Sequence, residues 1–304
     1  MKNTSYLSFF NQILLARGPL HSKWKNKKFR LMYLLRSMIS PVSSIRYYQE
    51  LHSLKSIDKI LEMQPTLPAK IHRPYLHKGG LAWNRRKNII GHYRFVQSLP
   101  VKHQALLLPD RDVLLVHFTG KNGEDFDIHC SSGGFDREGE LMLSLSFNNT
   151  PVARLSFSVI PSKKGHCAFI GGLQGAPKNI GPDIIRDATK ACYRLFPKRI
   201  VFEVLCSLMR CCDITNILAV SEQSHVFRQW RYRYKKRKYF VALYSDFWES
   251  VAGRPYGNWY KLPIYVERKS FNELASKKRA EYRRRYDLLD HINEEIMILL
   301  QNQM

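Results

Sequence analysis

The spacing of apolar and polar residues changes twice along this chain of 304 residues and divides it into three regions. Residues 1–109 have a helical pattern that is punctuated into short helices by Pro41, Pro65, Pro68 and Pro74. Residues 110–267 change to the two-residue period of strands, mixed with helical segments. Residues 268–304 return to the helical period. We therefore predict a helical N-terminal region packed on the core, an α+β core and an amphipathic C-terminal helix.

The first half of the core is predicted to be an antiparallel meander. Residues 113–118 form an apolar run, and KNGE at 121–124 is a turn signal. Leu141, Leu143, Leu145 and Phe147 alternate with smaller or more flexible residues, as in a strand with one buried face. The turn at 148–151 then leads into strands at 152–160 and 165–171.

The second half of the core mixes helices and strands. Pro182 suits the first position of a helix that we expect to end near Phe196, and Pro197 opens a second helix that reaches about Cys212. Strands are expected at 214–220, 239–244 and 262–267, with a helical turn at 246–251. Ser276 caps the C-terminal helix. The predicted fold class is α+β, a mainly antiparallel sheet covered by helices, with an acetyltransferase-like arrangement as one candidate form.

The charge narrows the class of partner. The chain has 49 Lys and Arg against 25 Asp and Glu, a net charge of +24. Such an excess favours polyanionic partners, and nucleic acid, anionic lipid and phosphorylated glycolipid are the candidates. The alternative is a basic surface that only keeps the protein in solution. Acidic residues outnumber basic ones in the meander, so the excess lies on the flanking regions and indicates a directed basic surface.

Two basic segments are candidate anion sites. Residues 228–238 interleave cations, among them Arg231 and Arg233, with aromatic residues, a pattern that suits single-stranded nucleic acid, a membrane interface, or a half-buried strand. The C-terminal helix begins with cations that oppose its dipole, which suggests that they bind an anion together with the free amides of the first turn. These cations are Lys277, Lys278, Arg279, Arg283 and Arg284.

A glycine-rich segment at 171–181 separates a strand from a helix. Backbone amides and a helix N-terminus in such a segment can bind phosphate, as in the pyrophosphate turn of acetyltransferase-like folds. The cofactor that this interpretation implies is acyl-CoA, and the alternative is a mobile loop of turn residues. The residues that would bind it are Gly171, Gly172, Gln174, Gly175 and Gly181.

Histidines and cysteines supply little further chemistry. His225, just after a strand, and His92 are the two candidate catalytic residues, each against the alternative of a hydrogen-bonded structural histidine. We expect no metal site, because neighbouring histidine and cysteine in a strand point to opposite faces. The six cysteines form no C-x-x-C pair and indicate free thiols in a reducing compartment, which predicts a cytoplasmic location.

Membrane contact is expected to be peripheral. The apolar residues between Leu7 and Leu15 predict an amphipathic helix rather than a signal peptide, because Asn11 and Gln12 interrupt them and no small-residue cleavage site follows. The apolar stretch at 29–39 is too short to span a bilayer and contains Arg30 and Arg36. The protein is therefore predicted to lie in the cytoplasm, with the inner-membrane surface as a candidate place of contact.

Several short motifs occur together in the chain: GHY at 91–93, IGGLQG at 170–175, DATK at 187–190, ILAVS at 217–221 with His225, FWES at 247–250, SKKRA at 276–280 and YRRRY at 282–286. As a set they resemble the VirK/YbjX family of enterobacterial virulence-associated proteins. The resemblance implies a role in virulence, in resistance to antimicrobial peptides and in maintaining the lipopolysaccharide-bearing envelope, with an anionic lipid or phosphorylated envelope precursor as partner. An acyl-CoA-dependent acyltransferase and an RNA-binding regulator are the alternatives.

Overall fold

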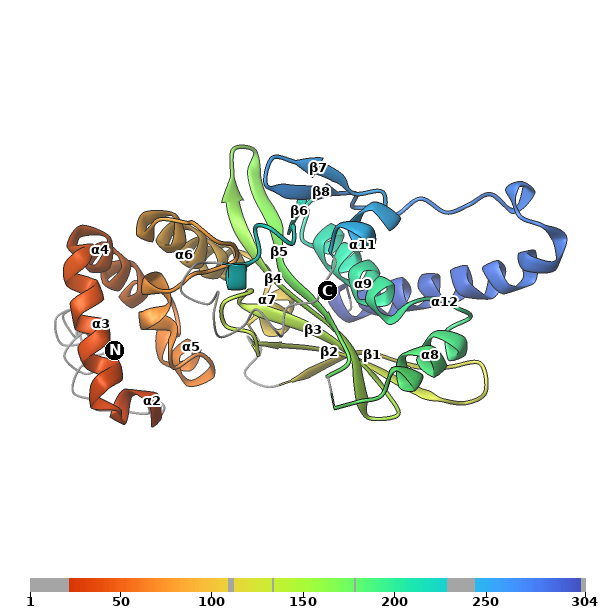
Figure 1. The fold of residues 1–304 in the computed structure, drawn as a ribbon, viewed down its shortest axis with the longest axis horizontal. Helices are drawn as coiled ribbons and strands as arrows, with labels where there is room; N and C mark the ends of the chain where they lie inside the picture. The colour runs from red at the N-terminus through yellow and green to blue at the C-terminus, as the bar shows by residue number, and fades with distance from the viewer. Residues whose placement is uncertain (1–21, 109–111, 133, 178, 229–243, 302–304) are drawn as a thin grey trace.

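The computed structural model describes residues 22–108, 112–132, 134–177, 179–228 and 244–301. A single mixed sheet lies at the centre of the molecule, with the N-terminal helices on one side and the C-terminal helices on the other (Figure 1). The fold is therefore α+β, as the sequence predicts. The predicted N-terminal amphipathic helix at 7–15 and the basic segment with Arg231 and Arg233 fall outside these residues.

The described part of the N-terminal region consists of helices of 4 to 17 residues, as its helical spacing predicts. Trp24 is fully buried there, donates a hydrogen bond from Nε1 to the Pro65 carbonyl (2.6 Å) and packs edge-on against Phe29 and Tyr33. The last long helix of the region, α6, packs directly on strand β4 (Thr150–Ser162). The elements are α2 (Ser22–Lys25), α3 (Lys27–Ile39), α4 (Pro41–His52), α5 (Ile57–Met63), η1 (Leu67–His72), α6 (Ala82–Ser98) and α7 (Val101–Leu107).

The sheet has the strand order β1-β2-β3-β4-β5-β6-β8-β7. The predicted meander is confirmed, and the alternation in β3 buries Leu141, Leu143, Leu145 and Phe147. β5 and β6 are paired in parallel, and every other neighbouring pair is antiparallel. The strands are β1 (Val113–Thr119), β2 (Asp125–Ser132), β3 (Leu141–Phe147), β4, β5 (Gly165–Gly175), β6 (Ile217–Val220), β7 (Arg254–Tyr256) and β8 (Trp259–Leu262).

The parallel pair needs a crossover, which two helices supply. α9 covers β3, β4 and β5, and the C-terminal helix packs against α9 and β1. Ser207 on α9 donates a hydrogen bond to Asn293 of that helix (2.7 Å). These elements are α8 (Pro182–Ala191), α9 (Pro197–Cys211), η2 (Val226–Arg228), α11 (Ser245–Ser250), η4 (Phe271–Glu273) and α12 (Ser276–Gln301). Among the described residues no helix is long and apolar enough to cross a membrane.

Several predicted boundaries are wrong. α8 ends at Ala191 instead of Phe196, because Tyr193 and Arg194 adopt left-handed backbone conformations with φ of 52° and 62°. β6 is limited to 217–220. The strand predicted at 262–267 is replaced by a hairpin of β7 and β8, whose turn contains Gly257 at a φ of 60°. The last strands of the sheet therefore lie on either side of Gly257, earlier in the sequence than the apolar pattern at 262–267 indicates.

All six cysteines are free, as predicted from their spacing, and five of them are buried. Burial raises the pKa of the Cys130 and Cys167 thiols to about 12. A thiol with so high a pKa is a poor nucleophile, because the thiolate is the reactive form. These cysteines therefore serve as small apolar side chains of the core.

Candidate functional site

A large groove lies between α6, the turn that joins β4 to β5, and strands β5, β6 and β8. Its volume is about 1030 Å³. Five lysines line it, from the loop before α6, from α6 itself, from the β4–β5 turn and from β8, and no acidic side chain of the described residues does so. We call it the lysine groove and define it by these residues: Lys78, Lys87, Lys163, Lys164 and Lys261.

Aromatic rings line part of the lysine groove. The ring of His77 lies 5.8 Å from that of Phe169 and 5.4 Å from that of Trp259, and these two rings meet edge-on at 5.5 Å. Trp83 on α6 lines another part and is 51% exposed, so its ring is available to a ligand. The groove thus joins apolar surface to positive charge. That combination fits a molecule with an anionic and an apolar part.

His77 adds no positive charge to the groove at neutral pH. Burial lowers the pKa of its imidazole, the backbone bond to Lys78 raises it in part, and Arg85 lowers it further. Nδ1 lies 2.8 Å from the Lys78 carbonyl oxygen and must donate to it, since that oxygen only accepts. Nε2 is therefore the unprotonated nitrogen of this histidine and can accept a hydrogen bond.

The candidate catalytic residue His225 lies beside the buried carboxylate of Glu138. His225 Nε2 lies 3.4 Å from Glu138 Oε1, and both side chains are 1% exposed. The backbone N–H of Phe227 donates to His225 Nδ1, so the ring proton of the neutral form is on Nε2, toward Glu138. Gln174 Nε2 donates to the same carboxylate at 3.1 Å. The pair is connected to the groove wall through the bridge between His77 and His225.

The other candidate catalytic histidine, His92, is a buried acceptor. Its Nδ1 accepts a hydrogen bond from the Val159 backbone N–H (3.2 Å), and the side chain is 1% exposed. Burial lowers its pKa to about 4, and Lys70 lowers it further while Glu140 acts in the opposite direction. This histidine is therefore neutral at physiological pH and ties α6 to β4.

A second buried acid, Glu140, was not singled out from the sequence. Lys70 Nζ lies 2.7 Å from Glu140 Oε2, and the two side chains are 2% and 1% exposed. Tyr93 donates to the same oxygen at 2.6 Å, and Lys70 also donates to Gln64. Burial alone would raise the Glu140 pKa, but Lys70, His92 and these hydrogen bonds outweigh it and lower the pKa. The pair links η1 to the start of β3.

Gly139 allows Glu138 and Glu140 to be buried side by side. A Cβ on Gly139 would lie 2.4 Å from the Phe157 carbonyl oxygen. The chain therefore crosses β4 at a distance that only glycine permits, with one carboxylate reaching His225 and the other Lys70. A Glu-Gly-Glu tripeptide directly before a strand was the sequence signal that could have identified this crossing.

The same crossing occupies part of the predicted phosphate loop. Gly171 and Gly172 belong to β5, which continues to Gly175, and a Cβ on either glycine would collide with Glu138. Gln174 is used by the same carboxylate. Gly175 has ordinary contacts, and Gly181 precedes α8 with open space around it. Packing against Glu138 accounts for the first two glycines, and ligand binding by this segment stays a prediction.

The cations at the start of α12 are exposed, and several have partners within the chain. Arg279 donates to the Leu274 carbonyl (3.1 Å), and Arg283 lies over the Phe271 ring. Arg284 lines a separate cavity of about 590 Å³ that also contains Glu124 and Asp187. The structure therefore does not bring them to the lysine groove. The residues concerned are Lys277, Lys278, Arg279, Arg283 and Arg284.

Comparison with known proteins gives the family. The model of the family described as "Protein of unknown function (DUF535)" matches residues 22–297. The uncharacterized protein YbjX of Escherichia coli K12 is 37% identical over 301 residues, which cover 97% of this chain and 90% of YbjX. An uncharacterized protein of Haemophilus influenzae is 27% identical over 198 residues, 64% of this chain and 63% of that protein. No solved structure matches significantly. This chain belongs to the DUF535 family, the VirK/YbjX family that the sequence motifs indicate.

Proposed function

We propose that this protein binds a phosphorylated molecule with an apolar part in the lysine groove. The observation that carries the proposal is the convergence of five lysines above aromatic rings, without an acidic side chain of the described residues in the lining. Mutually repelling lysines gather at some cost to stability, and a bound anion would offset that cost.

The shape and chemistry of the groove favour an amphiphile over a purely ionic ligand. A volume of about 1030 Å³ exceeds what a phosphate or diphosphate group needs and leaves room for an apolar portion against Phe169, Trp259 and Trp83. Lysine ammonium groups bind phosphate as mobile point charges and tolerate variation in ligand geometry. A phosphorylated lipid or lipid-like envelope precursor is the substrate class that fits both halves of the groove.

The family resemblance supplies the cellular setting of the proposal. A basic protein that binds such a precursor at the inner-membrane surface would support envelope or surface virulence-protein biogenesis and, through it, resistance to antimicrobial peptides. The positive charge of the chain favours such anionic surfaces. RNA binding through Trp230, Tyr232 and Tyr234 stays a prediction, because those residues lie outside the described ranges.

An acyl-CoA-dependent acyltransferase is the second candidate, and the sheet topology favours it. β5 and β6 are a parallel pair inside an antiparallel sheet, and their pairing ends at Ile170 and Ala219. β5 continues to Gly175, after which the chain reaches α8 at Pro182. A strand that leaves its parallel neighbour and leads to a helix N-terminus is the arrangement expected of a pyrophosphate-binding turn.

One titration experiment tests the proposal and separates the two candidates. The probes are farnesyl diphosphate, inorganic diphosphate and acetyl-CoA, titrated calorimetrically at one fixed ionic strength. The groove variant is Lys87→Gln with Lys164→Gln. The control variant, Lys59→Gln with Lys269→Gln, removes the same charge at exposed positions outside the groove.

The groove variant should bind farnesyl diphosphate about tenfold or more weakly than the parent protein does, since two charge-assisted contacts are lost. The control variant should bind it as the parent does, and inorganic diphosphate should bind less tightly than farnesyl diphosphate. Equal weakening in both variants would reduce the effect to nonspecific charge attraction and refute the groove. Tight binding of acetyl-CoA that neither variant weakens would favour the acyltransferase.

A further inference from the structure

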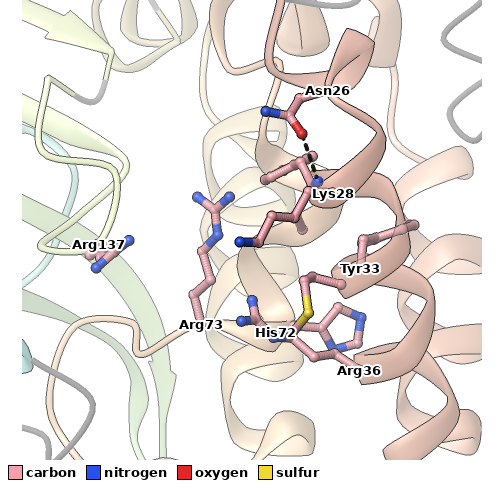
Figure 2. A pocket seen from close by; sticks show the side chains of 10 residues that line it. Asn26, Lys28, Tyr33, Arg36, His72, Arg73 and Arg137 are labelled. Atoms are coloured by element: carbon pink, nitrogen blue, oxygen red, sulfur yellow. Dashed lines mark hydrogen bonds between the residues drawn. The ribbon is translucent and has the colours of Figure 1, made fainter.

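A second basic hollow lies on the N-terminal side of the molecule, between α3, η1 and the segment before β3. Its volume is about 430 Å³, and its wall includes Asn26, Tyr33 and His72 (Figure 2). Four cationic side chains line it, from three segments that are far apart in the sequence. We call it the arginine hollow and define it by these cations: Lys28, Arg36, Arg73 and Arg137.

The walls of the arginine hollow are fixed by specific contacts. Arg73 pairs with Asp136 (3.4 Å), and its guanidinium lies 5.2 Å from the centre of the Phe29 ring. The backbone carbonyl of Arg137 accepts a hydrogen bond from the Leu76 N–H (2.7 Å). The Asn26 side chain caps α3 by accepting from the Phe29 N–H (3.2 Å). These contacts hold α3, the end of η1 and the segment before β3 around one space.

Basic side chains outnumber acidic ones around the hollow, where Asp136 is paired with Arg73. The charged residues of α3 are all Lys or Arg. No acidic side chain of the described residues lines the hollow. His72 lies in its wall, and burial, followed by Arg85, Arg36 and Arg73, lowers the pKa of that imidazole to about 4. The histidine is therefore neutral at pH 7, and the positive charge of the hollow comes from its lysine and arginine side chains.

We propose that the arginine hollow binds a phosphomonoester group. Guanidinium groups donate in a fixed planar geometry that matches phosphate oxygens, and Lys28 adds a point charge at the rim. The site is separate from the lysine groove and shares no lining residue with it. It therefore stands independently of the function proposed for that groove.

The phosphomonoester can belong to a soluble metabolite or to a lipid headgroup. Apolar side chains on the neighbouring face of α3 and on α4 are exposed, which makes the lipid source worth testing directly. Residues of this kind next to a cationic hollow suit a membrane interface. They are Leu31, Leu35, Met38, Ile39 and Val42.

The experiment compares two double variants of the full chain. Lys28→Gln with Arg36→Gln removes two lining cations of α3. Lys27→Gln with Arg30→Gln removes one exposed lysine and one partly buried arginine from the same helix, but neither lines the hollow. One arm titrates glycerol 1-phosphate calorimetrically at fixed ionic strength. The other measures flotation with phosphatidylcholine vesicles that do or do not contain phosphatidic acid.

The parent protein is expected to bind glycerol 1-phosphate, vesicles with phosphatidic acid, or both. The hollow variant should bind the same probe about tenfold to a hundredfold more weakly. The control variant should keep the affinity of the parent protein. Binding of glycerol 1-phosphate identifies a soluble source, and binding only to vesicles with phosphatidic acid identifies a lipid headgroup. Equal loss in the two variants, or no binding in either arm, overturns the site. Should the hollow variant unfold, Lys28→Gln against Lys27→Gln makes the same comparison at exposed positions.

Discussion

Replacing Lys70 by methionine removes one charge of the ion pair that Lys70 and Glu140 form inside the protein. Both side chains are almost completely buried, and Nζ lies 2.7 Å from Oε2. Methionine fills similar space, so the main loss is electrostatic. The Glu140 carboxylate, whose ordinary pKa is 4.5, would be stranded in the core. It can escape by taking up a proton, which at pH 7 costs about 3 to 4 kcal/mol.

This cost sets the magnitude of the prediction. Breaking a buried pair by removal of one partner typically costs about 3 to 5 kcal/mol, a large part of the roughly 5 to 15 kcal/mol that stabilise a domain. The double variant Lys70→Met with Glu140→Gln leaves no charge behind. It should therefore be destabilised by less than the sum of the two single variants.

Urea unfolding followed by circular dichroism measures these free energies. The pH dependence provides a second test, because the Glu140 pKa is lowered in the folded parent protein. The Glu140 carboxylate therefore stabilises the parent protein fully above its unfolded pKa of 4.5. That contribution is lost as the pH falls through the pKa of the folded state. In Lys70→Met the penalty for the stranded carboxylate shrinks as the pH approaches 4.5. A loss under about 1 kcal/mol at pH 7, strict additivity, or a difference that does not change with pH would refute the reasoning.

Two further predictions concern Gly139, where the chain crosses β4, and His92 on α6, the helix that packs on β4. Gly139→Ala should destabilise the protein by about 1 to 3 kcal/mol, because the added Cβ would lie 2.4 Å from the Phe157 carbonyl oxygen. Urea unfolding measures this loss. Gly175→Ala is the control, because its Cβ would lie 3.7 Å from the nearest atom. His92 should stay neutral down to about pH 4, so its stabilising contribution is full above 6.5 and is lost between 6.5 and 4; an NMR titration of its ring with a midpoint near 6.5 would contradict this.

The local pattern of the sequence determined the class of fold and much of its order. Alternation in β3 predicted the buried face that the structure has, since a strand side chain points to one face at every second residue. Prolines at the first turns of α8 and α9 marked the starts of both helices. Composition determined the positive charge and the absence of a disulfide framework. Each of these features depends on composition or on residues that are close in the sequence.

Only the tertiary structure decided where the charges meet. The five lysines of the groove come from four segments, and the cations of the arginine hollow from three, so no local pattern joins them. The buried carboxylates of Glu138 and Glu140 contradict the usual exposure of acidic residues, because side chains from other segments hold them: Lys70 pairs with Glu140, and Gln174 donates to Glu138. Burial of a charge depends on contacts between distant segments, and those contacts exist only once the sheet and its covering helices have assembled.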